Sequence, residues 1–280
     1  MTRLATQRPL LRTRRTPARR TPARRARARR AEPCSNARGF TFVELMVAIA
    51  LGLFLIGGLL TLVQAMRRTN TNQSGLSQLQ DNERMAMQLI TDVVQSTGYF
   101  INPTTQTAVS SFPVAAYGSA SFTSPGQALV GAGTWGVPGH VITTRFWTAG
   151  MNPPNFDNTI NCTGNPSNTP ANFVNQISVA NNYLTCTLWV NDVASPTVNL
   201  VPGITDMQIL YGVLSGNGTA TNSVDTYLDA ATVGTNWNQV KSVQVTLTFL
   251  NPLWGQPGQT QQYIKFTRTI DVMNKTGVTT

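Results

Sequence analysis

Histidine and cysteine are scarce in this chain, which has one histidine, His140, and three cysteines among its 280 residues. Structural zinc sites need four ligands, most of them cysteine or histidine. Because a single histidine cannot supply half of such a set, we interpret His140 as a structural or surface residue. The sequence therefore predicts no metal site of this kind, and we expect no cofactor.

The sequence motifs of common enzyme families are also missing. The chain has no Gly-x-Ser-x-Gly turn for a nucleophilic serine and no glycine-rich loop of the phosphate-binding type. Asp225 and Asp229 lie near Gly218 among asparagine and threonine. A calcium-binding loop is an alternative there, although the EF-hand spacing is absent. We therefore predict that the protein is not an enzyme.

Charged residues make up only 11% of the chain, and they are distributed unequally. Residues 1–39 contain thirteen arginines and one acid, Glu32, whereas the remainder contains eight basic and ten acidic residues. We expect this leader to be unfolded, because its like charges repel and it has little to bury. Such a segment is typical of the cytoplasmic side of a membrane protein. A nucleic-acid-binding arm is the alternative, although no aromatic residues lie between the arginines to stack on bases.

A run of nineteen residues from Leu45 to Val63 contains neither charge nor proline. At about 1.5 Å of rise per residue, a helix of this length spans roughly one bilayer core. No Ala-x-Ala cleavage site follows the run, as it would in a secretory signal peptide. The helical pattern continues beyond it, with an apolar face over residues 76–94 and Gly98 as a stop. We therefore predict one helix over residues 40–98, with residues 40–66 in the membrane.

Glu44 is an isolated acid directly before the apolar run. A carboxylate that enters a bilayer costs a few kcal/mol unless it is neutralised or paired. In one interpretation, Glu44 lies at the headgroup level in the first helical turn, where the helix dipole favours an anion. In the other, it pairs with a cation on a neighbouring subunit. Cleavage after Gly39 would create that cation, the α-amino group of Phe40.

After Asn102 the apolar residues alternate with polar ones, as in antiparallel strands with one covered face. The predicted strands are 140–147, 177–179, 183–190, 207–213, 243–249 and 264–270. We predict an α+β fold in which the apolar face of residues 76–94 covers an antiparallel sheet formed by residues 99–280. Asn181-Asn182 is predicted to be a hairpin turn, Tyr211-Gly212 an edge or bulge, and the five tryptophans mainly core. The long segments 102–127, 148–171 and 215–236 are predicted to be surface loops.

Two of the three cysteines, Cys162 and Cys186, lie in the β-rich part, whereas Cys34 lies in the leader. An even number of cysteines in an exported domain favours a disulfide. Two separate free thiols are the alternative interpretation.

The segment 39–47, GFTFVELMV, followed by an apolar helix, resembles the cleavage and methylation motif of type IV prepilins. The resemblance implies cleavage between Gly39 and Phe40 by a prepilin peptidase, N-methylation of Phe40, and a role for Glu44 in docking between subunits. The leader of residues 1–39 is longer than is usual in this family.

Later segments are similar to minor pilins of the PilW type, namely 79–84, 98–100, 201–213, 240–245 and 266–270. The resemblance implies a minor pilin that initiates or decorates a type IV pilus and supports adhesion, twitching motility or DNA uptake. It implies an inner-membrane precursor with a cytoplasmic N-terminus and a periplasmic C-terminal domain, found later in the pilus at the cell surface. The implied partners are the peptidase, other minor and major pilins, the inner-membrane assembly platform and, before assembly, membrane lipid. A type II secretion pseudopilin and a membrane-anchored binding protein with a basic cytoplasmic arm remain alternatives.

Overall fold

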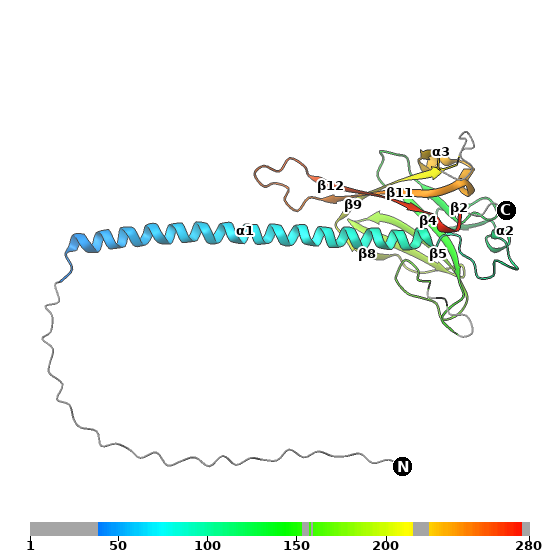
Figure 1. The fold of residues 1–280 in the computed structure, drawn as a ribbon, viewed down its shortest axis with the longest axis horizontal. Helices are drawn as coiled ribbons and strands as arrows, with labels where there is room; N and C mark the ends of the chain where they lie inside the picture. Colours follow the sequence, from blue (N-terminus) through cyan, green and yellow to red (C-terminus); the bar gives the residue numbers. More distant parts are fainter. Residues whose placement is uncertain (1–38, 153–156, 158, 215–223, 276–280) are drawn as a thin grey trace, which may run out of the picture. The chain divides into compact units, whose positions relative to one another are not determined.

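The computed structural model of the chain describes residues 39–152, 157, 159–214 and 224–275. Nearly all of the predicted leader, and part of the predicted loop 215–236, lie outside these residues. The chain divides into two units, of which the first ends at Leu59 and the second is Leu60–Thr280. Figure 1 shows the fold and labels many of the helices and strands.

The longest element is helix α1, Phe42–Gln95, which has 54 residues. No proline occurs between Phe40 and Asn102, so no residue within this stretch lacks the N–H that the helix needs. A turn follows the helix, and within it Gly98 has a φ of +78°, a left-handed conformation that glycine adopts without steric cost. The helix therefore begins and ends slightly inside the predicted range of 40–98.

In the second unit, one face of α1 packs against strands. Its buried residues are Leu79, Ala86, Met87, Ile90, Val93 and Val94. They recur at helical spacing, as the apolar pattern of residues 76–94 predicts. Met85 was included in that predicted face, but its side chain is 57% exposed.

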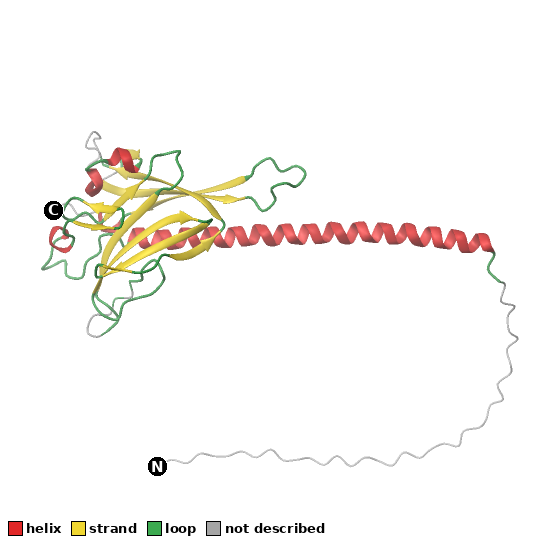
Figure 2. Ribbon diagram, turned by 180° about the vertical axis from the view of Figure 1, so that it is seen from behind, coloured by secondary structure: helices red, strands yellow, loops and turns green. Residues whose placement is uncertain are grey.

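The strands form antiparallel pairs throughout the three sheets (Figures 1 and 2). The six-stranded sheet contains β3 (Leu129–Ala132), β4 (Val141–Thr148), β5 (Ala171–Ala180), β6 (Tyr183–Val190) and β7 (Val193–Ala194), with β8 (Val198–Pro202) also paired to β6. The four-stranded sheet has the order β10 (Thr226–Leu228), β9 (Ile204–Val213), β11 (Val240–Leu250), β12 (Tyr263–Asp271). The smallest sheet pairs β1 (Ala115–Tyr117) with β2 (Ala120–Phe122). The α+β class is confirmed, but the single predicted sheet is wrong, because the strands divide between two large sheets.

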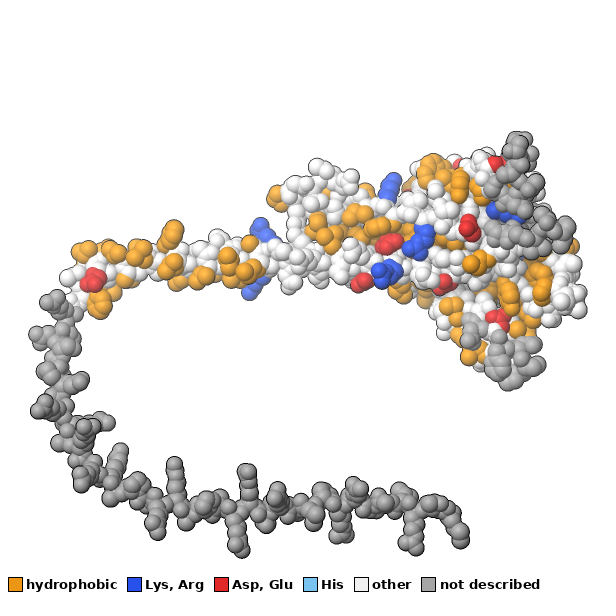
Figure 3. All heavy atoms as spheres, in the orientation of Figure 1, with side chains coloured by type: hydrophobic (Ala, Val, Ile, Leu, Met, Phe, Trp, Pro, Cys, Tyr) orange, Lys and Arg blue, Asp and Glu red, His pale blue; other side chains and the backbone are white. Residues whose placement is uncertain are grey.

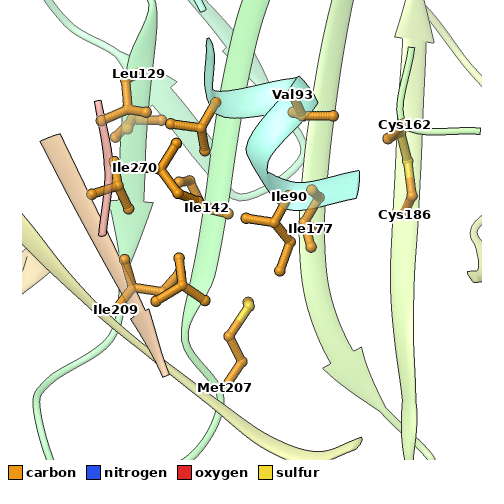
Figure 4. Packing of buried hydrophobic residues seen from close by; sticks show 14 of the residues in the cluster. Ile90, Val93, Leu129, Ile142, Cys162, Ile177, Cys186, Met207, Ile209 and Ile270 are labelled. Carbon is orange, nitrogen blue, oxygen red and sulfur yellow. A yellow bond between two sulfur atoms is a disulfide. The ribbon is translucent and has the colours of Figure 1, made fainter. Parts of the chain in front are cut away.

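The core of the second unit lies between α1 and these sheets. In Figure 4, Ile90 of α1 lies close to Ile142 of β4 and Ile177 of β5. Met207 and Ile209 of β9 approach the same cluster from the four-stranded sheet. Each of these five side chains is at most 1% exposed, so the helix and both large sheets share one core.

Strand β4 differs from the prediction in its burial. The alternating pattern placed Thr143 and Arg145 on a polar face, yet both are 1% exposed. The preceding segment covers that face: the Arg145 Nε donates to the carbonyl of Gln127 at 2.7 Å, and its guanidinium lies 4.2 Å from the centre of the Phe122 ring. An alternating sequence shows that a strand has two faces but not that a second layer covers the polar one.

Two predicted long loops contain regular elements. Helix α2 (Ala108–Ser111), β1 and β2 lie within 102–127, and β10 and helix α3 (Ala230–Val233) lie within 215–236. Two short 3-10 helices, η1 (Asn236–Gln239) and η2 (Met273–Lys275), complete the second unit. Because these elements have only three or four residues each, they are too short to show a period in the sequence.

Both predicted features of the strand ends are present. Asn181 and Asn182 have φ of 52° and 62°, as a two-residue turn between β5 and β6 requires. Gly212 faces a register shift in β11 between Val240 and Ser242, which is a bulge. Gly212 does not lie at an edge, because it also pairs with Tyr227 of β10.

The tryptophans follow the core prediction only in part. Trp189 and Trp237 are buried, and Trp237 packs edge-to-face on Tyr211 with ring centres 4.8 Å apart. Trp135 and Trp254, however, are 50% and 47% exposed. For those two residues the core prediction is wrong, since both lie in connections between strands and not within them.

Candidate functional site: the start of helix α1

The residues expected to be processed lie immediately before α1. Gly39 and Phe40 are exposed and outside the helix, and Phe40 is 83% exposed. A Cβ atom added to Gly39 would meet no other atom within 4 Å. The peptide bond between these two residues is therefore accessible.

Thr41 forms the N-terminal cap of the helix. Its hydroxyl accepts a hydrogen bond from the Glu44 N–H at 3.3 Å, and its carbonyl accepts one from the Leu45 N–H at 3.2 Å. A threonine cap followed three residues later by glutamate is the pattern of a capping box. Our sequence reasoning missed the role of Thr41, although the spacing Thr-x-x-Glu could have shown it.

Glu44 lies in the first turn of α1, and its side chain is exposed. The N-terminus of a helix carries a partial positive charge that stabilises a nearby carboxylate. The Thr41 hydroxyl satisfies the Glu44 N–H, which is one of the N–H groups at a helix start that have no partner within the helix. The structure thus places Phe40, Thr41 and Glu44 together at one helix end.

The helix that follows is apolar on every side. Large side chains such as Leu53, Phe54 and Leu55 are 65%, 81% and 66% exposed. Figure 3 shows hydrophobic side chains all along this part of α1. By length and composition α1 can cross a membrane, and its most apolar stretch is not buried within the protein. A helix that is hydrophobic all round requires lipid or other apolar helices around it.

Glycine and alanine leave parts of the apolar surface of α1 without large side chains. Gly52, Gly57 and Gly58 are helical, and a Cβ on any of them would meet nothing within 4 Å. No described part of the chain therefore needs these glycines for its own packing. Ala48 and Gly52, four residues apart, are spaced to let another helix approach closely.

In the second unit, Cys162 and Cys186 form a disulfide with a Cα–Cα distance of 6.3 Å. Cys186 lies in the middle of β6, whereas Cys162 belongs to the connection between β4 and β5. The Asn175 side chain also holds this connection, because its Oδ1 accepts from the Cys162 N–H at 2.8 Å. The disulfide and this hydrogen bond therefore tie the connection between β4 and β5 to the six-stranded sheet.

His140 is 1% exposed and uses both ring nitrogens within the protein. The Nδ1 accepts a hydrogen bond from the Ile209 N–H at 3.1 Å, and Nε2 lies 2.9 Å from the carbonyl of Thr134. This arrangement requires the neutral tautomer with the proton on Nε2. His140 thus links the connection before β4 to β9, which is a structural role.

In the candidate calcium loop, the Asp229 side chain accepts hydrogen bonds from the protein itself. Asp229 is the N-cap of α3, where Oδ1 accepts from the Thr232 N–H at 2.9 Å. Its Oδ2 accepts from the Trp135 N–H at 3.0 Å. These hydrogen bonds, led by the one from the Thr232 hydroxyl, lower the pKa of Asp229. Within residues 39–152, 157, 159–214 and 224–275 there is no cluster of three side chains suited to hold a metal ion.

Models of two known sequence families match parts of the chain. A sequence model of the prokaryotic N-terminal methylation motif matches residues 34–60, and a model of the type IV pilus-assembly protein W family matches residues 168–278. Among solved structures, a type IV-like pilin from Thermus thermophilus is 12% identical, with a TM-score of 0.39, and the match covers 71% of this chain and 99% of the pilin. A search of curated proteins found no match.

The methylation motif and the apolar helix with antiparallel sheets on its second part define a type IV pilin-like prepilin. The motif implies processing by a prepilin peptidase and association with other pilins, and the helix indicates membrane anchoring. Within this class, the match over residues 168–278 supports a pilus-related minor pilin of the PilW family. That family is structural.

Proposed function

We propose that this chain is the precursor of a minor pilin that is cleaved between Gly39 and Phe40 and then methylated on the Phe40 amine. Residues 1–39 would be the leader, residues 40–98 the helix, and residues 99–280 the exported pilin domain. The observation that carries the proposal is the exposed Gly39–Phe40 bond directly before a capped, uniformly apolar helix. Removal of the leader would leave that helix on the mature protein.

The basic leader gives the expected orientation. Thirteen arginines precede the apolar span, whereas only Arg67 and Arg68 follow it closely. Positive charge is retained on the cytoplasmic side, so the N-terminus would be cytoplasmic and residues 99–280 periplasmic before assembly. Residues 40–66 would lie in the inner membrane, in contact with lipid, until the assembly platform transfers the subunit into the fibre.

Glu44 would then direct docking. Its exposed carboxylate and the new Phe40 amine carry opposite charges at the same helix end. A subunit displaced along the fibre axis would present its amine to the Glu44 of its neighbour. An ion pair surrounded by apolar side chains fixes the register between helices even where its net stabilisation is small.

Substitution of Glu44 tests the docking role. Leaving one partner of a buried pair alone costs about 3–5 kcal/mol, which is at least about a hundred-fold in an equilibrium constant. We expect Glu44→Ala to be cleaved and methylated normally but to enter sheared fibres at least about a hundred-fold less than the wild type. Glu44→Asp keeps the charge and should retain part of the incorporation.

Glu83→Ala is the matched control, because it removes an acid from the same helix beyond the apolar span. It should leave fibre incorporation unchanged. Normal incorporation of Glu44→Ala would contradict the docking role.

The subunit would initiate or decorate the fibre and thereby support adhesion, twitching motility or DNA uptake. A type II secretion pseudopilin has the same helix and motif, so it remains the second candidate. Deletion of the gene separates the two: loss of piliation supports the minor pilin, and loss of protein secretion with normal pili supports the pseudopilin.

A further inference from the structure

A cavity of about 540 Å³ lies on the side of the six-stranded sheet that carries β1 and β2. This is within the range of about 300–1,000 Å³ of small-molecule sites. Aromatic side chains contribute to its walls, namely Tyr117 of β1, Trp147 of β4 and Trp189 of β6. The Trp147 indole N–H donates to the carbonyl of Ser111 at 3.0 Å, which fixes this ring in place.

The cavity contains one buried cation and one anion. Arg145 is 1% exposed, and its Nε and Nη2 donate to the carbonyls of Gln127 and Phe112. The Tyr117 hydroxyl donates to the Asp192 Oδ1 at 2.6 Å. Burial lowers the pKa of Arg145 to about 10, while Tyr117 and Asp192 oppose that shift. The lining of the cavity therefore holds one basic and one acidic side chain.

Two buried oxygen atoms in the same lining have no hydrogen-bond partner among the described residues. They are the Ser111 Oγ and the Asn172 Oδ1, and the Ser111 side chain is only 8% exposed. An amide oxygen only accepts hydrogen bonds, whereas a hydroxyl can accept or donate. Leaving such groups unpaired away from water is costly. Both oxygens are themselves buried, so each side chain must turn toward the cavity to meet a ligand. The Asn172 oxygen then requires a donor, whereas the Ser111 hydroxyl can pair with a donor or an acceptor.

The carboxylate is held at a fixed position. Asn191 and Asp192 form the turn between β6 and β7, with φ of 48° and 66°. The Asn191 Oδ1 accepts from the Asn172 N–H at 2.9 Å, and the Asn191 N–H donates to the Asn172 carbonyl at 3.0 Å. These two hydrogen bonds tie the turn to β5, so Asp192 and Asn172 are placed together.

We propose that this cavity binds a neutral, hydroxyl-rich ligand, namely a saccharide unit. Sugar hydroxyls can donate to the Asn172 Oδ1 and can pair in either direction with the Ser111 hydroxyl, and the C–H faces of a sugar ring pack on aromatic rings. An anionic ligand would be repelled by Asp192, and an anionic oxygen could not donate to the Asn172 Oδ1. A cationic ligand would be attracted by Asp192 but repelled by Arg145, so the lining as a whole favours neither sign of charge. The inference goes beyond the proposed role in fibre assembly.

The test is saturation-transfer NMR on the full mature protein in a detergent without a sugar headgroup. The probes are glucose, galactose, mannose, N-acetylglucosamine and their neutral disaccharides, with glucose 6-phosphate and glucosamine as charged counterparts. We expect at least one neutral probe to bind and neither charged probe to bind as well. Failure of every neutral probe, or stronger binding of a charged one, would overturn the proposal.

Three variants decide whether a bound probe occupies this cavity. Ser111→Ala and Asn172→Ala each remove one hydrogen bond and should weaken binding about three- to ten-fold. Asp192→Asn preserves the turn, since asparagine tolerates positive φ, but removes the acidic side chain from the lining. It should weaken binding of neutral probes and improve binding of glucose 6-phosphate.

Asn182→Asp is the matched control, because Asn182 lies in the same kind of turn between β5 and β6. It should leave every affinity unchanged. Equal binding by Ser111→Ala, Asn172→Ala and the wild type would place the ligand elsewhere and refute the assignment. Fibre incorporation of the same variants is measured separately. Failure of the saccharide proposal can therefore be distinguished from failure of the proposed role in fibre assembly.

Discussion

In the first part of α1, Leu53, Leu55 and Ile56 are 65%, 66% and 55% exposed, whereas near its end Ile90 and Val94 are fully buried. The two parts belong to one uninterrupted helix, so backbone geometry does not explain the contrast. The difference lies in the arrangement of apolar residues. Those of the first part surround the helix, and those of the second form one strip. A strip can be covered by the sheets of the same chain, but a helix that is apolar all round needs partners outside the chain.

Substituting matched isoleucines gives the largest expected difference between the two parts. Ile90→Ala removes buried volume from the shared core and should lower the free energy of unfolding by about 2–5 kcal/mol. For a domain of this size that corresponds to a fall of about 5–15 °C in Tm. Ile56→Ala should change the Tm by less than about 1 °C. Near-UV circular dichroism of the tryptophans during heating in detergent measures both, and an equal loss in the two variants would refute the contrast.

Removal of the disulfide is expected to be the next largest effect and to be confined to the second unit. The double variant Cys162→Ala, Cys186→Ala should lose about 2–4 kcal/mol of stability, the usual range for one such crosslink. Chemical denaturation of the mature protein with and without reductant provides the measurement. Reduced wild type should match the double variant measured without reductant, because the proposed cleavage removes the third cysteine, Cys34, with the leader. An unchanged denaturation midpoint in the double variant would show that the disulfide does not stabilise the domain.

Loss of the helix cap should affect only the first part of α1. Thr41→Ala removes the hydroxyl that accepts from the Glu44 N–H. A lost N-cap costs about 1 kcal/mol, so exchange of the Glu44 and Leu45 amide hydrogens should be about five-fold faster. Thr41→Ser retains the hydroxyl and is the control. Exchange that is equally fast in Thr41→Ser would rule out the cap as the cause.

The smallest effect concerns the glycines. A Cβ on Gly75 would lie 3.1 Å from the Cβ of Pro252, in the connection between β11 and β12, whereas a Cβ on Gly57 would meet nothing. Paired amides also tie that connection to α1, with the Asn72 Nδ2 2.9 Å from the Gln256 Oε1. We expect Gly75→Ala to speed hydrogen exchange in residues 251–262 by about two- to three-fold, because the connection must move by a few tenths of an ångström. Gly57→Ala should have no such effect, and equal exchange in both variants would show that the contact is loose.

The sequence predicted what depends on a long or repeated pattern. The helix, the buried positions of residues 79–94, and the strands that contain Ile142, Ile177 and Val245 all follow from periods of 3.6 or 2. The turn at Asn181-Asn182 follows from its residue types. The processing site is inferred from glycine, aromatic residue, acid and apolar helix occurring together, and it stays a prediction.

Other features could not be predicted, because they depend on contacts between distant segments. Arg145 reads as an exposed residue of an alternating strand until Gln127 and Phe122 are seen to cover it. The division into two sheets depends on which strands pair with each other. The alternation of apolar and polar residues along a strand does not specify its partner. The cavity beside Trp189 combines residues from 111 to 192, with no spacing that connects them.

The central claim is that the first part of α1 becomes functional only when the leader is removed and the new amine meets other subunits. The most direct test is the intact mass and N-terminal sequence of this protein in purified fibres. We predict a chain that begins at N-methylated Phe40 and lacks residues 1–39. A fibre-associated chain that retains the arginine-rich leader, or a mature protein found only outside fibres, would contradict the account.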